Sequence, residues 1–266
     1  MTLVEGALLG VVQGLTEFLP VSSSAHLILA RTVFGWDAGE LNLAFDVACH
    51  LGTLVAVGAF FGGDIAALVR GVPSALSTRP SLDGRRIWLL AAAMVPVILV
   101  GLTMSDYIDA VRDRPRLTAL ALIAGAGLLF LVERLSARSG TEATLSMPGA
   151  LAIGAAQAMA LLPGVSRSGA TITAGMLLGM SRLAAARFTF LLSVPAIGAA
   201  AVHEGLKLRH VALGGHDWSL FGVGLVTSAV VGYLTVGFLL KFLVNHRLDV
   251  FAWYRIAIGV AILAWL

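Results

Sequence analysis

The sequence has little charge for its length. Only 12% of its 266 residues are Asp, Glu, Lys or Arg, whereas soluble domains carry about 25%. A chain with so few charged side chains cannot cover a globular surface with them in water, which argues against a soluble protein. Hydrophobic residues make up 58% of the chain, and the mean hydropathy is +0.92.

Several classes of site are also missing. Cys49 is the only cysteine, so an internal disulfide and a thiolate metal cluster are excluded. The sequence has no Gly-Lys-Ser/Thr step and no His-Glu-x-x-His motif, which excludes a P-loop and the corresponding zinc site. The formal net charge of +3 is small, and we interpret it as loop arginines facing a membrane surface rather than a nucleic-acid footprint.

The chain instead contains apolar runs long enough to cross a bilayer, which takes about 20 residues per helix. We predict an all-α polytopic membrane protein with about six full transmembrane helices. Their expected ranges are 42–62, 87–104, 117–134, 183–203, 219–241 and 250–266. The segments 62–86 and 105–116 are expected to be loops.

Four further apolar segments, 3–19, 22–33, 147–162 and 168–180, are short and interrupted by proline and serine. Short apolar segments are typical of re-entrant helices. At a constant offset of 144, GVVQGLTEFLPVSSSA from residue 10 and GAAQAMALLPGVSRSG from residue 154 share Gly, Gln, Val and two Ser. An odd number of spans follows each pair, so the second copy is upside down. We therefore predict an inverted-topology repeat with two re-entrant pairs, over about 1–134 and 147–266 of one membrane domain, 1–266.

The positive-inside rule gives an orientation. Eight basic residues fall on the side that we assign to the cytoplasm: Arg70, Arg79, Arg85, Arg86, Arg134, Arg138, Lys241 and Arg247. Five fall on the other side: Arg112, Arg114, Arg116, Lys207 and Arg209. This bias places both termini and the first re-entrant pair on the outer side, and the second pair on the inner side.

The two interruptions carry the candidate site. A proline ends one short helix in each, and the serines that follow suit the N-cap of the next helix. Each interruption then aims a helix N-terminus, a favourable anion site, toward the middle of the protein. Arg167 can hold two phosphate oxygens at once, and Ser166, Ser168 and Thr171 can add donors.

Glu17 and His26 add reactive groups to this anion site. A carboxylate repels an anionic ligand unless a cation or a proton intervenes. Glu17 therefore either ligates a divalent metal that also holds the phosphate, or orients His26 as base, acid or nucleophile. Ionisable residues inside a membrane are costly, so function is the first hypothesis for both. These residue types suit phosphoryl transfer.

These motifs resemble those of one family. Residues 13–27, QGLTEFLPVSSSAHL, resemble the Glu/Gln-x-x-x-Glu motif, with its following serines and histidine, of the bacterial undecaprenyl-diphosphatase family, also called the bacitracin-resistance protein family. Residues 163–171, PGVSRSGAT, match that family's Pro-Gly-x-Ser-Arg-Ser-x-x-Thr motif in full. The resemblance covers essentially the whole chain.

The resemblance implies a phosphatase of the bacterial cytoplasmic membrane. Such an enzyme hydrolyses undecaprenyl diphosphate to undecaprenyl phosphate at the outer face, using a divalent metal, here Mg or Ca. It recycles the lipid carrier for peptidoglycan synthesis and confers bacitracin resistance. The expected partners are the prenyl diphosphate lipid and the bilayer, with no nucleic acid, and a homodimer stays open.

The resemblance also implies roles for single residues. Glu17 and His26 are expected to be catalytic, Arg167 to bind phosphate, and Ser23 and Ser166 to contribute closely. Water, His26 and Ser23 all remain candidate nucleophiles. Gln13 stands where many members carry a glutamate, so a metal held by Glu17 and Gln13 is expected to bind more weakly. The other expected substrate contacts are Ser22, Ser24, Gly164, Ser168 and Thr171.

Two other functions compete with this one. A transporter or flippase also uses inverted repeats with broken helices, but a pure anion carrier has little reason to place Glu17 and His26 beside its phosphate. A lipid phosphatase of the acid-phosphatase type is disfavoured, because its Ser-Arg-x5-His-x3-Asp motif is missing.

Three further features are expected to be structural. Asp46 and His50, four residues apart on one helix, are expected to meet, either as a support for the site or as a simple local pair. Arg255 is expected to snorkel or to pair rather than to bind substrate. His203, His210 and His216 are expected to be solvated.

Overall fold

The computed structural model describes residues 1–112, 114–136, 139–208 and 213–265, and over these ranges the chain is helical with no β-strand. The all-α prediction is confirmed for this part of the chain. Arg138, Arg209 and His210 lie outside the described residues. The elements in chain order are α1 (Leu3–Thr16), α2 (Ser23–Phe34), η1 (Gly39–Leu41), α3 (Asn42–Phe60), α4 (Gly62–Ala75), α5 (Leu82–Thr103), α6 (Ser105–Arg112), α7 (Pro115–Leu135), η2 (Glu142–Thr144), α8 (Met147–Met159), α9 (Arg167–Leu177), α10 (Arg182–Leu208), α11 (Gly215–Asn245) and α12 (Asp249–Trp265).

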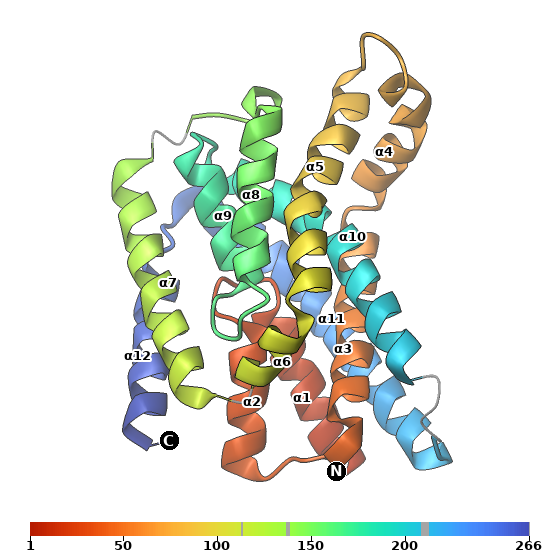
Figure 1. The fold of residues 1–266 in the computed structure, drawn as a ribbon, viewed down its shortest axis with the longest axis vertical. Coiled ribbons are helices and arrows are strands. Elements are labelled where there is room, and N and C mark those ends of the chain that lie inside the picture. The colour runs from red at the N-terminus through yellow and green to blue at the C-terminus, as the bar shows by residue number, and fades with distance from the viewer. Residues whose placement is uncertain (113, 137–138, 209–212, 266) are drawn as a thin grey trace.

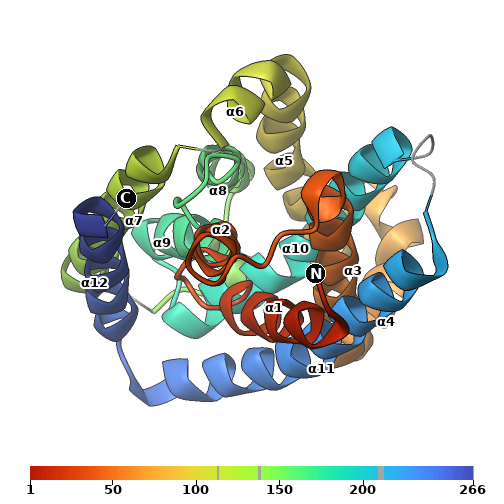
Figure 2. The same ribbon diagram turned by 90° about the horizontal axis from the view of Figure 1, so that it is seen from below.

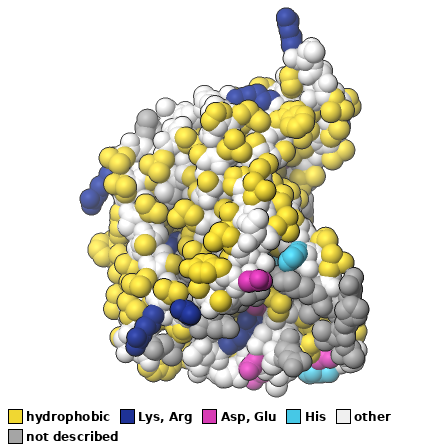
Figure 3. Space-filling view, viewed as in Figure 1, with side chains coloured by type: hydrophobic (Ala, Val, Ile, Leu, Met, Phe, Trp, Pro, Cys, Tyr) yellow, Lys and Arg dark blue, Asp and Glu magenta, His cyan; other side chains and the backbone are white. Residues whose placement is uncertain are grey.

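Five of these helices, α3, α5, α7, α10 and α11, are long and apolar enough to cross a membrane. The chain is therefore a multi-pass membrane protein. The sixth predicted span corresponds to α12, which has 17 residues. Yellow hydrophobic side chains cover much of the middle of the visible face, and the dark blue Lys and Arg side chains lie mainly at its upper end, its left edge and its lower part (Figure 3).

Two predicted loops contain helices instead. The range 62–86 includes α4, which packs against α5. Trp88 Nε1 donates a hydrogen bond to the carbonyl of Ala75 (2.8 Å), and Gly71 lets the two helices approach, since a Cβ there would lie 2.9 Å from Asp83 Cβ. Asp64, Arg70 and Pro73 interrupt the apolar pattern of α4. The sequence pattern therefore did not indicate a helix there. The range 105–116 likewise contains α6.

The four short helices of the two interruptions, α1, α2, α8 and α9, form two hairpins (Figure 1). Helix α1 packs on α2 and α11, and α8 packs on α9 and α5. The turns of the two hairpins meet near mid-height, and both termini lie at the lower end (Figure 1). Seen from below, α2 and α9 lie near the centre, whereas the α7–α12 pair and α11 lie at the periphery (Figure 2).

Two glycines bring α1 and α8 close to the helices behind them. A Cβ added at Gly10 would lie 2.8 Å from the carbonyl oxygen of Gly224 in α11, and one added at Gly154 would lie 2.4 Å from the carbonyl oxygen of Ala93 in α5. These are the glycines that the sequence alignment pairs at an offset of 144. Both hairpins are thus seated through backbone-to-backbone contact at the aligned position.

Candidate active site

The first interruption lies between α1 and α2. Helix α1 ends at Thr16, Glu17 is its C-cap, and Pro20 follows in the turn. Ser22 precedes α2 with a φ of 74°, a left-handed conformation that is uncommon for residues other than glycine. Helix α2 then begins at Ser23. The first N–H groups of a helix have no partner within it, so they are free to meet an anion at this turn.

The second interruption repeats this geometry. Gly164, after Pro163, has a φ of 91°, and Ser166 has a φ of 67°. Ser166 Oγ caps α9 by accepting from the Gly169 N–H (3.2 Å). Helix α9 begins at Arg167. Ser23 and Arg167, also 144 residues apart, are therefore the first helical residues after the two interruptions.

The two turns are joined directly. Ser168 Oγ donates to the carbonyl of Leu19 (2.9 Å), and the guanidinium of Arg167 forms an ion pair with the carboxylate of Glu17. The sequence predicted that both halves would contribute to one site, and the structure brings Glu17 and Arg167 into contact across 150 residues. The ion pair explains how a carboxylate is tolerated here, because the neighbouring cation offsets its charge.

Glu17 is the centre of the polar cluster. Its side chain is 5% exposed, and Oε1 accepts from Arg167 Nη2. Its other oxygen, Oε2, accepts from Ser23 Oγ (2.6 Å) and from Gln13 Nε2 (2.9 Å). A serine hydroxyl bonded to an oriented carboxylate is the arrangement of a nucleophile and its general base. Gln13 and Arg167 fix the orientation of that carboxylate.

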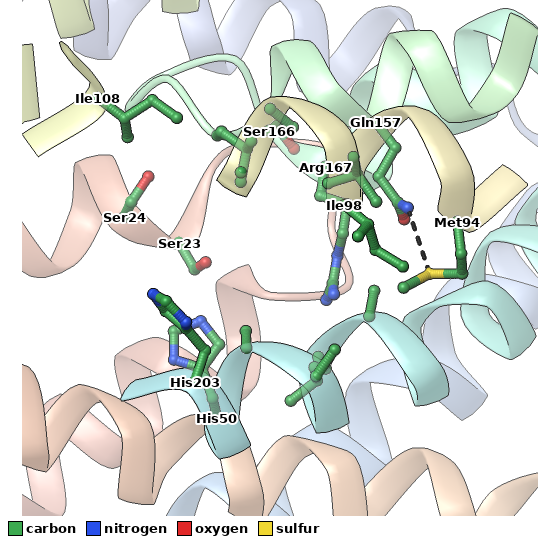
Figure 4. Close-up of a pocket in the computed structure, with 18 of the residues that line it drawn as sticks. Ser23, Ser24, His50, Met94, Ile98, Ile108, Gln157, Ser166, Arg167 and His203 are labelled. Carbon is green, nitrogen blue, oxygen red and sulfur yellow. Dashed lines mark hydrogen bonds between the residues drawn. The ribbon is translucent and has the colours of Figure 1, made fainter. Parts of the chain in front are cut away.

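A cavity of about 400 Å³ opens beside this cluster. Ser23 and Arg167 point into it from the two interruptions, and His50 and His203 face it from below (Figure 4). Its polar lining also includes Glu17, Ser22, Ser24 and Ser166. The rest is mostly apolar and comes from α5, α6, α10 and the turn after α8, including Val97, Ile98, Leu102, Ile108, Leu161 and Ile197. The cavity thus offers a polar end and an apolar path.

His26 lies elsewhere. Its Nδ1 bonds to the carbonyl oxygen of Ser22 (2.7 Å), and its Nε2 bonds to the hydroxyl of Tyr254 (2.7 Å), with the two rings stacked 5.5 Å apart. Among the described residues that line the cavity, His26 does not occur. Its position one turn after Ser22 supports the first interruption, and its catalytic role stays a prediction.

His50 is the imidazole that faces Glu17. Its Nε2 lies 3.7 Å from Glu17 Oε2, and its Nδ1 bonds to the backbone oxygen of Asp46 (2.7 Å). Because a carbonyl only accepts, Nδ1 carries the proton and Nε2 is the nitrogen turned toward the site. The sequence predicted that the side chains of Asp46 and His50 meet, either as a support for the site or as a local pair. The two side chains do not pair, since the Asp46 carboxylate is held by two bonds from Arg31 (2.6 and 3.0 Å), whereas His50 does lie at the site.

Other predicted residues have internal partners. The Thr171 hydroxyl donates to the carbonyl of Arg167 (2.8 Å) and accepts from Thr189 (2.9 Å). Arg255 neither snorkels nor forms an ion pair among the described residues, because it is 1% exposed and donates to backbone carbonyls. His203 is exposed, as predicted, and it borders the cavity. Position along the sequence gave no sign of these contacts.

The oxygen atoms around Glu17 are suitable ligands for a hard divalent cation. Gln13 Oε1 is buried and has no hydrogen-bond partner among the described residues, and it lies on the side chain that contacts Glu17. Together with the Glu17 carboxylate and the Ser23 hydroxyl it gives an all-oxygen set, as Mg²⁺ and Ca²⁺ prefer. The described residues contain no group of three or more His, Cys, Asp or Glu that could hold a metal. Phosphate oxygens or water would have to complete the coordination.

Comparison with known proteins identifies the family. The model of the bacitracin resistance protein BacA family matches residues 6–261. The chain belongs to this family. It is 44% identical to an undecaprenyl-diphosphatase of Geobacter metallireducens, covering 100% of this chain and 99% of that protein. It is 43% identical to one of Rubrobacter xylanophilus over 100% and 99% of the two chains, and 41% identical to one of Desulforudis audaxviator over 97% and 96%.

Proposed function

We propose that this member of the BacA family is an integral membrane phosphatase. It hydrolyses undecaprenyl diphosphate to undecaprenyl phosphate and inorganic phosphate, recycling the lipid carrier for cell-wall synthesis and conferring bacitracin resistance. The names of the relatives support the substrate, and the polar and apolar ends of the cavity suit a diphosphate and its prenyl chain. The single observation that carries the proposal is the contact of Glu17 with both Ser23 and Arg167 at the cavity wall.

The reaction follows from this contact. Ser23 Oγ attacks the terminal phosphorus, its proton passes to Glu17 Oε2, and the bond to the bridging oxygen breaks to release prenyl monophosphate. The proton on Glu17 leaves with the prenyl monophosphate. Water then attacks the phosphoserine and gives its proton to the freed carboxylate, the bond from phosphorus to Ser23 Oγ breaks, this oxygen takes the proton back, and inorganic phosphate leaves. Arg167 and the N–H groups that begin α2 and α9 hold the phosphoryl oxygens, whose charge must be stabilised throughout. Ser22, Ser24, Ser166, Ser168, Thr171 and Gly164 shape the turns that present these groups, and His26 stays the alternative nucleophile or base.

A divalent cation, Mg or Ca, completes the proposed site. Glu17 and Gln13 would hold it, together with oxygens of the diphosphate. When bound, it neutralises phosphate charge and polarises the phosphoryl oxygens. A single carboxylate is a weak ligand set, so we propose that the metal binds tightly only with substrate present.

We further propose how the fold is placed in the bilayer. The chain is one membrane domain, with repeats over about 1–134 and 147–266, and the two hairpins are re-entrant. The inverted repeat is supported by matching contacts: α1 packs on α11 as α8 packs on α5, while α7 with α12 and α3 with α10 pair across the halves. Membership of a bacterial family supports a cytoplasmic membrane location, and the positive-inside rule supports the orientation in which the site opens to the outer face.

Phosphate release tests the function. Purified protein in detergent, given a long-chain prenyl diphosphate and Mg²⁺, is expected to release inorganic phosphate, and chelation should stop it. Arg167→Ala should lower kcat/KM by about 10³-fold, because this arginine stabilises the transferred phosphoryl group. Arg85→Ala, which removes an arginine that binds the carbonyls of Ala143 and Leu145 away from the cavity, is the control. If folded protein moves the lipid across the membrane of proteoliposomes without releasing phosphate, the transporter hypothesis would be favoured instead.

A further inference from the structure

Arg255 is a charged side chain in the interior that the proposed chemistry does not use. It comes from the middle of α12 and is 1% exposed. It is the largest side chain among the fully buried ones that the structure describes. Within the described residues no carboxylate lies within ion-pair distance of its guanidinium. Such a group is costly to keep inside a protein unless its donors are satisfied.

Its partners are backbone carbonyls of both interruptions. Nη1 donates to Pro20 O (3.2 Å) in the first, and Nη2 lies within bonding distance of Gly164 O (3.0 Å) and Val165 O (3.1 Å) in the second. The remaining bonds reach α7, from Nε to Leu122 O (3.0 Å) and from Nη2 to Ala121 O (3.1 Å). One guanidinium therefore ties two distant turns and a third helix together.

The carbonyls of the two turns have few other hydrogen-bond donors available to them. Chain turns inside a bilayer leave carbonyl groups that no helical ladder satisfies. Val165 directly precedes Ser166, and Pro20 lies two residues before Ser22, the two serines with positive φ. Strained conformations of this kind persist only where surrounding groups over-determine them. The bonds from Arg255 fix the Val165–Ser166 peptide plane, directly before one strained serine, and the Pro20–Val21 plane, one peptide before the other.

The space for the guanidinium is made by glycine. A Cβ added at Gly125 of α7 would lie 2.0 Å from Arg255 Nη2, and one added at Gly169 of α9 would lie 2.9 Å from Nη1. Gly127, two residues further along α7, has nothing within 4 Å of such a Cβ. Gly125 thus offers a way to displace the guanidinium without changing Arg255 itself, and Gly127 offers a matched control on the same helix.

We propose that Arg255 is a positioning residue that holds the two interruptions in register. It keeps Ser23, at the start of α2, and Arg167, at the start of α9, at the spacing that phosphoryl transfer needs. The catalytic part of this inference rests on the proposed function. The structural part, that one side chain orders both turns, does not.

Arg255→Lys and Gly125→Ala test the proposal beside Gly127→Ala. Lysine has three donors on one nitrogen and cannot form the planar fork of five. We expect both test variants to lower kcat by on the order of 100-fold, the effect of a displacement of about 1 Å in a reacting geometry, with a smaller change in KM. Gly127→Ala should match wild type.

Hydrogen exchange separates positioning from general stability. In intact protein in detergent, both test variants should exchange faster in peptides covering 18–26 and 162–170, while peptides from α3 and α11 keep wild-type rates. Retention of kcat within about threefold in Arg255→Lys would overturn the proposal, and so would faster exchange along the whole chain with a lowered melting temperature. If wild-type protein releases no phosphate, the proposed function fails, and the exchange at the two turns still decides the role of Arg255.

Discussion

Substitutions at Ser23 and Glu17 should lower activity as a coupled pair rather than independently. The hydroxyl of Ser23 lies 2.6 Å from Glu17 Oε2, so the serine needs this carboxylate to lose its proton, and the carboxylate has no other proton to take in the first step. We therefore predict that Ser23→Ala, Glu17→Gln and the double variant have similar residual activity. Groups that act as a unit are strongly non-additive in this way.

The size of the effect follows from the roles. Loss of a general base lowers kcat by about 10²–10⁴-fold, or about 3–5 kcal/mol of transition-state stabilisation at 1.36 kcal/mol per tenfold. Two independent losses of 10³ would multiply to about 10⁶. A coupled pair should leave the double variant within about tenfold of either single one.

The assay is phosphate release under single-turnover conditions at saturating Mg²⁺, with folding checked by thermal melting in detergent. Glu142→Gln is the matched control, since Glu142 also pairs with an arginine, Arg86, but lies outside the cavity lining. Ser23→Ala activity within threefold of wild type would refute serine as the nucleophile and leave water in that role. Losses that multiply in the double variant would refute the coupled pair.

Two further predictions concern the neighbours of this pair. Gln13→Glu should lower the Mg²⁺ concentration for half-maximal activity by about tenfold, because it adds a second carboxylate to the oxygen set; an unchanged or raised concentration would remove Gln13 from the metal site. His26→Gln should lower kcat by about 10²-fold or more if His26 transfers a proton, whereas Tyr254→Phe, which removes only the bond to Nε2, should cost less than tenfold. Equal losses in these two variants would show that His26 acts only by holding the turn.

The broken helices could be predicted because their causes are local. In each interruption a proline is followed closely by serines, so the turns around Pro20 and Pro163 follow from a few neighbouring residues. Proline alone was not sufficient, since Pro96 and Pro195 lie inside α5 and α10. Ser166 caps α9 as predicted, whereas Ser22 makes no side-chain capping bond to α2. The long apolar runs predicted α3, α5, α7, α10 and α11 for a similar reason. Helix α4 was missed because its stabilising contacts, from Trp88 and Asp83, come from another helix.

The site contacts between distant segments could not be predicted. Nothing near Glu17 in the sequence indicates that Arg167 neutralises it, that His50 faces it, or that His26 turns toward Tyr254 instead. Each contact depends on the angle at which a helix crosses its neighbour, and hydropathy does not encode that angle. Arg255 is the clearest case. Its partners are backbone carbonyl oxygens, which every residue carries, so the identity of the partner residues could not indicate the contacts.

The proposed repeat explains why these contacts come from equivalent positions of the two halves. Two copies of one hairpin provide two helix N-termini, and the first residue after each strained serine faces the same cavity. In one copy that residue is Ser23, and in the other it is Arg167. Glu17 aligns with Leu161, which also lines the cavity, so only the first copy carries a base. In the proposed mechanism, the first copy therefore supplies the attacking group and its base, and the second copy supplies the phosphate-binding arginine. Arg255 joins the two turns through backbone carbonyl oxygens, which every residue carries.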